Sequence, residues 1–340
     1  MKLRPLAYVG AMMLVLLVAN VSIAGAAKPG PGSSTGSGRV FFPNPVASLQ
    51  NQSLTDQKDA DYAALQPAYH NVTLTNLDGS GFLHGDWVSV VSETGDPAYS
   101  PTNTFSYGRS DDRFEQVMAY YWLTEAQKYI QSLGFGTGRF RPVNMKSQAV
   151  RINQWGLDNS FATDHPKDEL RFGKGGVEDA EDAEVILHEY GHAIHFSQNF
   201  IFGSEQAGAI SEGFGDYWAV TISNLIAPTP DAPCVADWDS TSYTSRVPHC
   251  LRRVDLDLHY PGDLNGEVHH DGQIWSRALW DIRQALGNVK ADTIIIEGQF
   301  DFPGTTMPDL AQATVAAADR LYGKSAAKAV RAAFEARGIL

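Results

Sequence analysis

The spacing of apolar residues divides the chain into a strand-rich first part and a helical second part. From Arg39 to about Tyr107, short stretches of alternating apolar and polar residues, such as 72–77 and 87–91, lie between Gly, Asp and Pro turn signals. Apolar residues at helical spacing predict a helix over 112–133, and short strands and turns are expected over 139–176. Helices are then predicted at 179–198, 207–226, 271–287, 308–322 and 324–337.

This order of elements predicts an α+β protein with two lobes. A chain of 340 residues fits two modest lobes better than one small core. The strand-rich N-terminal lobe is expected to span 39–176 and the mainly helical C-terminal lobe 177–340, with a cleft between them.

The first residues indicate export. Residues 1–26 have a basic start, an apolar run over 6–21 and a small-residue cleavage site ending at Ala26, which is typical of a signal peptide. A membrane anchor is the competing interpretation, but the run is short for a spanning helix and no later segment is long and apolar enough. Residues 27–38, rich in Gly, Pro and Ser, are interpreted as a flexible linker. The mature protein is therefore expected to be secreted or periplasmic, without a stable membrane anchor.

Charge and cysteine content narrow the functional classes. Signal cleavage removes two bases and no acid and so moves the formal net charge from −13 to −15, which argues against nucleic acid as a partner. The two cysteines, Cys234 and Cys250, are expected to form a disulfide in an oxidising compartment. The sequence does not indicate an oligomeric state.

The chemistry centres on the segment His188-Glu-Tyr-Gly-His192. On a helix, the two imidazoles four residues apart project from one face and can reach one metal ion. The surrounding residues are apolar nearly all round the helix, and two histidines with a carboxylate do not enter such an interior unpaired. We therefore expect zinc at this segment, with Glu189 beside it as a catalytic base.

A second helical segment offers the third ligand. Glu212 and Asp216 lie one turn apart within Ala209-Ile-Ser-Glu-Gly-Phe-Gly-Asp216, so both fall on one helix face. Glu212 can ligate the metal, and Asp216 can accept a hydrogen bond from the second ring nitrogen of His188.

With these two motifs in register, the chain resembles the thermolysin-like and fungalysin-like metallopeptidases of the gluzincin group. The resemblance implies a two-lobed zincin fold and a zinc endopeptidase that acts on protein or peptide substrates. It also implies that Asn159 holds the substrate backbone and that His269 and Arg252 stabilise the oxyanion. His270 and Arg253 are the neighbouring alternatives for these two positions.

The chain departs from the thermolysin-like pattern at two points. The position at which those enzymes carry a catalytic tyrosine would fall on Gly203, and no tyrosine occurs between Tyr190 and Tyr217. Glu184 stands where they carry a calcium-binding aspartate. Calcium is thus a possible second cofactor, although acids at the start of a helix also complement its dipole.

Three functions are consistent with these patterns. The preferred one is a secreted zinc endopeptidase that uses an activated water, with Glu189 as general base. A catalytically silent zinc protein that binds a peptide or a surface partner is the alternative suggested by the missing tyrosine. An aminopeptidase of the same group is the third, disfavoured because no Gly-Ala-Met-Glu-Asn type motif is present.

Overall fold

A computed structural model describes residues 34–91 and 95–340. The expected signal peptide, residues 1–26, lies outside the described residues, as does the first part of the expected linker. The linker prediction is wrong for Ser34–Gly38, which form the first half of strand β1 (Ser34–Phe41). These residues pair with β2 (Tyr69–Leu77) through backbone hydrogen bonds, which require no apolar side chain. Gly38 is also needed for packing, since a Cβ there would lie 2.7 Å from Val117.

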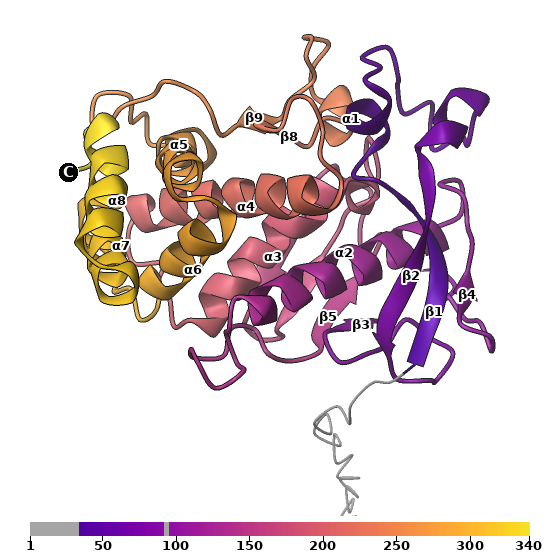
Figure 1. The fold of residues 1–340 in the computed structure, drawn as a ribbon. Coiled ribbons are helices and arrows are strands. Elements are labelled where there is room, and N and C mark those ends of the chain that lie inside the picture. Colours follow the sequence, from indigo (N-terminus) through magenta and orange to yellow (C-terminus); the bar gives the residue numbers. More distant parts are fainter. Residues whose placement is uncertain (1–33, 92–94) are drawn as a thin grey trace, which may run out of the picture.

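Two small sheets build the first part of the molecule (Figure 1). The first has the order β2-β1-β4, with β4 at Thr104–Phe105. The second has the order β3-β5-β7-β6, in which β3, β5 and β7 run parallel and β6 is an antiparallel edge strand. Its strands are β3 (Val88–Val90), β5 (Gln148–Arg151), β6 (Phe161–Thr163) and β7 (Glu169–Arg171). The short helix α1 (Pro45–Leu49) was not predicted.

The long helices fall close to the predicted ranges. α2 (Arg113–Ser132) packs against β1 and β3, and its buried face joins the two sheets to the helical part. α6 (Asn288–Gly298) was not predicted, because its β-branched run Thr293–Ile296 has weak intrinsic helix propensity. The remaining helices are α3 (Ala183–Ser197), α4 (Glu205–Ile226), α5 (Val268–Leu286), α6 (Asn288–Gly298), α7 (Met307–Tyr322) and α8 (Lys324–Ala336).

Glycines let α4 approach both α3 and α5 closely. A Cβ at Gly191 on α3 would lie 2.9 Å from the Cα of Gly215 on α4. A Cβ at Gly213 would lie 2.2 Å from the carbonyl oxygen of Gly272 on α5. The two glycines of α4 flank the face that carries Glu212 and Asp216, so the close crossing brings that face against α3.

One hydrophobic core runs through both parts of the molecule, from Val40 on β1 to Phe334 on α8. The predicted α+β class agrees with the observed order of strands and helices. The boundary near residue 176 stays a prediction, because the core is continuous across it. Within the described residues, no helix is long and apolar enough to cross a membrane.

Candidate metal centre and active site

Helix α3 presents the first two candidate metal ligands. Asp182 caps this helix by accepting a hydrogen bond from the backbone N–H of Glu184, which fixes where the helix begins. His188 and His192 follow one turn apart, with ring centroids 4.9 Å from each other and ring planes 84° apart. Both rings therefore face the same space beside α4.

Glu212 on α4 completes a cluster of three possible ligands. Its Oε2 lies 3.1 Å from His188 Nε2, and its Oε1 lies 3.5 Å from His192 Nε2. One donor atom from each of the three side chains lies within 4.8 Å of the other two. Two imidazoles with one carboxylate, and room for a further ligand, are the donor set of catalytic zinc sites.

Asp216 fixes the orientation of His188 from behind. The Nδ1 of His188 lies 2.8 Å from Asp216 Oδ1, so Nε2 is left to face Glu212. Arg252 on β9 (Arg252–Arg253) donates two hydrogen bonds of 2.7 Å to the two oxygens of Asp216. Burial alone would raise the pKa of Asp216, but Arg252 and the hydrogen bond from His188 lower it to about 2. Asp216 is therefore an ionised acceptor at neutral pH.

His192 has a different second partner, which the sequence did not reveal. Ser211 Oγ lies 2.8 Å from His192 Nδ1 and 3.0 Å from His195 Nδ1. The single hydroxyl proton can serve only one of the two rings, so Ser211 accepts from one histidine and donates to the other. Burial holds the pKa of His195 well below its usual range, so this ring is neutral. If His192 binds a metal through Nε2, its proton lies on Nδ1, and Ser211 then accepts from His192 and donates to His195.

Glu189 is placed as a base would be. It is 7% exposed, and its Oε2 has no hydrogen-bond partner among the described residues. Burial is the main cause that raises the pKa of Glu189 to about 7, against the opposing effect of His188. A carboxyl with a pKa near neutrality both accepts and returns a proton readily.

The structure also distinguishes His269 from its neighbour His270, and Arg252 from its neighbour Arg253. His269, at the start of α5, has its Nε2 3.3 Å from Glu212 Oε2, whereas His270 turns to Asp271. Arg252 reaches Asp216, whereas Arg253 pairs with Asp231 and Asp255.

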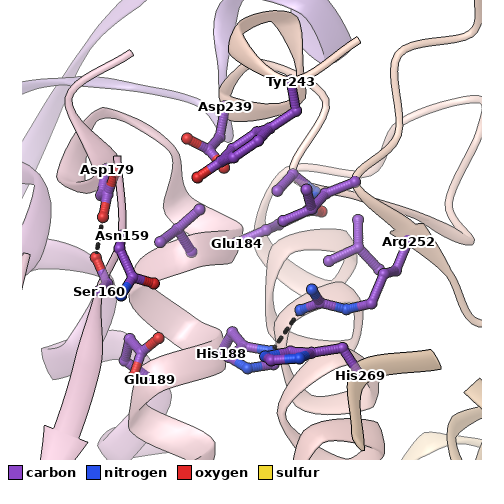
Figure 2. A pocket seen from close by; sticks show the side chains of 14 residues that line it. Asn159, Ser160, Asp179, Glu184, His188, Glu189, Asp239, Tyr243, Arg252 and His269 are labelled. Carbon is purple, nitrogen blue, oxygen red and sulfur yellow. Dashed lines mark hydrogen bonds between the residues drawn. The ribbon is translucent and has the colours of Figure 1, made fainter. Parts of the chain in front are cut away.

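Two cavities open on either side of these residues. One is lined by Asn159, His188, Glu189, Arg252 and His269 together with further acids, as Figure 2 shows. The other is lined by Ser160–Ala162 of the edge-strand segment and by Phe196 and Phe202. Glu189 and His269 line both. Asn159 lines the first cavity, and its contact with substrate stays a prediction.

The charges of the cluster suit a cation. Burial disfavours a charged His188, but its hydrogen bonds with Asp216 and Glu212 raise its pKa to about 10. Burial lowers the pKa of His192 to about 4, while the nearby histidines hold the pKa of Glu212 well below its usual range. Metal binding requires neutral imidazoles and an ionised carboxylate, so a bound cation would displace the proton that His188 otherwise holds. The residues present fit a bound divalent metal.

Comparisons with known proteins show which families and structures this chain is similar to. The model of the fungalysin metallopeptidase family (M36) matches residues 174–297, which contain all three candidate ligands, Glu189, Asp216 and His269. Over these residues, the chain is similar to the fungalysin metallopeptidases. A gelatinase of Enterococcus faecalis is 28% identical over 172 residues, which cover 47% of this chain and 34% of the gelatinase. The chain thus spans about a third of the length of that relative.

The fold comparison covers more of the chain. The precursor of protealysin, a metalloproteinase from Serratia proteamaculans, superposes with a TM-score of 0.51 at 18% identity, over 66% of this chain and 78% of that one. This likeness confirms the predicted two-lobed fold. It carries no argument about the ligands or substrate of this chain.

The two remaining chemical predictions differ in outcome. The disulfide between Cys234 and Cys250 is confirmed; Cys234 lies on β8 (Cys234–Val235), which pairs with β9 and so holds Arg252 in place. Calcium stays a prediction. The oxygens of Glu184 accept from Ser223 Oγ and the backbone N–H of Ala236, so this acid acts in local packing rather than as a simple dipole partner.

Proposed function

We propose that the protein is a secreted zinc endopeptidase, with His188, His192 and Glu212 as the metal ligands. The observation that carries the proposal is the convergence of these three side chains beside a buried carboxylate, Glu189, that has an oxygen free to take a proton. A structural metal site has no need of such an acid. The family relationship supports a metal, and the nitrogen and carboxylate donors favour zinc.

The residues of the chain divide the work of peptide hydrolysis. Bound zinc would supply a Lewis acid and lower the pKa of a water molecule towards neutrality. Glu189 then accepts the proton of the attacking water at its free oxygen and passes it to the leaving amine. His269, half exposed over the cleft, offers Nε2 to the oxygen that becomes negative. A preorganised donor of this kind typically contributes about 3 kcal/mol to transition-state stabilisation.

Arg252 plays a part beyond the one expected from sequence. Two of its donors, Nε and Nη2, are held by Asp216. It keeps Asp216 ionised and aligned on His188, and it adds positive charge at the wall of the cavity that faces Glu189. We therefore propose Arg252 as a positioning residue first and as an oxyanion partner second.

The decisive experiment combines metal content with activity. Purified protein should contain about one zinc per chain and cleave casein, and a chelator should abolish cleavage until zinc is restored. Glu189→Gln should retain the zinc and lose at least about 10²-fold in kcat, the lower end of what a general base contributes. Zinc-free protein that still cleaves casein would contradict the proposal.

The two alternatives give other results in the same assay. A silent zinc-binding protein would hold zinc without cleaving. An aminopeptidase would shorten an unstructured protein stepwise from its N-terminus, whereas an endopeptidase gives internal fragments that mass spectrometry identifies.

A further inference from the structure

The cavity shown in Figure 2 ends in a group of acids that hydrolysis itself does not need. Asp179 and Asp239 lie on the side of this cavity away from His188 and His269 in the figure. One carboxylate oxygen each from Asp158, Asp179 and Asp239 lies within 4.8 Å of the other two. Asp179 is 2% exposed and Asp239 4% exposed, so these charges are almost fully withdrawn from water.

These carboxylates are only partly satisfied. Asp179 Oδ2 accepts from Ser160 Oγ and from the backbone N–H of Gly173, and Tyr243 donates its hydroxyl to Asp158. Asp179 Oδ1 and Asp239 Oδ1 are buried and find no hydrogen-bond partner in the part of the chain that the structure describes. A buried carboxylate oxygen without a hydrogen-bond partner is unfavourable, so a donor that enters the cavity and pairs with it would be stabilised there.

The protein supplies little positive charge of its own here. Among the described residues that line the cavity, Arg252 is the one lysine or arginine, and it is already paired with Asp216. Burial is the main cause that raises the pKa of Asp179 to about 7 and the pKa of Asp239 well above its usual range. A cationic guest would reverse this effect and bind together with the loss of protons from these carboxyls.

The walls of the cavity suit a side chain rather than a bare ion. Val185, Val235 and Leu251 line it together with the acids and the catalytic residues. Apolar walls that lead to a charged end match the methylene stem and the charged head of lysine or arginine. A calcium ion would need six or more oxygen ligands. One oxygen of Asp179 already accepts a hydrogen bond from Ser160, and one oxygen of Asp158 accepts from Tyr243.

We propose that this cavity is a specificity pocket that receives a basic side chain, lysine or arginine, of the peptide substrate. Because Glu189 and Arg252 line the same cavity, that side chain belongs to a residue directly next to the bond that is cut. This inference rests on the proposed peptidase function and names the substrate feature that the site selects. Asp239 and Asp179 are the residues that determine the selection.

The test measures binding separately from cleavage. Zinc-loaded Glu189→Gln protein is titrated with two fluorescent hexapeptides, Ala-Ala-Ala-Arg-Ala-Ala and its twin with citrulline, which keeps the shape of arginine but lacks the charge. The arginine peptide should bind at least about tenfold more tightly, a difference of about 1.4 kcal/mol. In parallel, mass spectrometry of a peptide library cut by the wild-type protein should find Lys or Arg on one side of the cut bond.

Matched variants identify the residues responsible. Asp239→Asn, or Asp179→Asn if the first variant fails to fold, should reduce the arginine preference to within about twofold. Asp164→Asn removes the same charge from an exposed position just beyond β6 and should leave the preference intact. Equal binding of both peptides, or a preference that survives both cavity variants, would overturn the inference.

Two further outcomes remain distinct. Calcium bound by the wild-type chain and lost in Asp239→Asn, without any arginine preference, would overturn the proposal in favour of a cation site. Arginine-selective binding without any chelator-sensitive cleavage would support the pocket and overturn the peptidase function instead.

Discussion

Arg252 donates two hydrogen bonds of 2.7 Å to Asp216, and Asp216 in turn accepts a hydrogen bond from the ring of His188. The contact between β9 and α4 thereby controls a candidate metal ligand on α3. This geometry determines which nitrogen of His188 faces Glu212, and so whether the ring can ligate at all.

Asp216→Asn should weaken zinc binding by about 10–100-fold, the range typical of lost partners behind metal-binding histidines. The amide removes the negative charge that holds Nδ1–H and leaves the half-buried guanidinium of Arg252 without its ion pair. The measurement is zinc affinity by competition with a chromogenic chelator.

Asp231→Asn is the matched control for this change. Asp231 also accepts two hydrogen bonds from an arginine of β9, here 2.8 Å each from Arg253, but it lies away from the metal ligands. Its loss should leave zinc affinity unchanged. Equal loss of affinity in both variants would show that Asp216 acts only through the folding of this hairpin.

Ser211→Ala should also reduce zinc affinity, but by about tenfold at most, because a neutral hydroxyl is a weaker acceptor than a carboxylate. His192 would lose the acceptor for Nδ1–H, and its ring could adopt the tautomer that does not ligate through Nε2. Ser223→Ala removes another buried serine hydroxyl of α4, which donates to Glu184, and serves as the control. Unchanged zinc affinity in Ser211→Ala would contradict the proposed hydrogen bond from His192 Nδ1–H to Ser211.

The sequence could predict the ligands because their chemistry is local. His188 and His192 share a helix face through a four-residue spacing, and Glu212 and Asp216 do so on the next helix, so periodicity alone places each pair. The two pairs meet only because the two helices cross closely. The glycines permit this crossing, but their presence in the sequence does not predict it. The helical pattern offered Glu212 as the third ligand, and the family resemblance supported that link.

Other features required the tertiary structure. Ser211 bridges His192 and His195 only because α4 crosses α3 at that depth, and Asp239 reaches Asp179 only through the fold of the segment after Cys234. Residues 34–38 showed no apolar alternation, yet backbone pairing alone holds them in β1. Long-range contacts of this kind leave no periodic signal in sequence.

The stability of the protein should fall as the pH rises towards about 8 in the absence of calcium. Burial and the neighbouring carboxylate of Asp182 raise the pKa of Asp237 to about 8. Between the ordinary carboxyl pKa near 4 and this value, the folded chain holds a proton that the unfolded chain has released. Each increase in pH within this window therefore favours unfolding. Thermal melts at pH 5 and pH 8 measure the effect.

Asp237→Asn should flatten this dependence and raise Tm at pH 8 more than at pH 5. A calcium ion bound at Asp237 would compensate its charge and so raise the wild-type Tm at pH 8 but not that of the variant. The exposed acid Asp263 provides the control substitution, Asp263→Asn. A calcium-dependent Tm shift of equal size in Asp237→Asn would place any bound calcium elsewhere.

The disulfide should matter for specificity as well as for stability. Cys234 and Cys250 lie 16 positions apart, and closing a loop of that size stabilises the fold by about 3 kcal/mol through the lost entropy of the unfolded chain. The closed loop carries Asp239 and Tyr243, which line the cavity in Figure 2, and Cys250 comes two residues before Arg252. The double variant Cys234→Ser, Cys250→Ser should therefore lose about 3 kcal/mol in urea unfolding and also bind the arginine peptide less selectively.

Zinc affinity of this double variant should change less, because the candidate ligands lie on α3 and α4 outside the loop. A variant that loses zinc and selectivity in equal measure would show that the loop supports the whole site rather than the cavity alone.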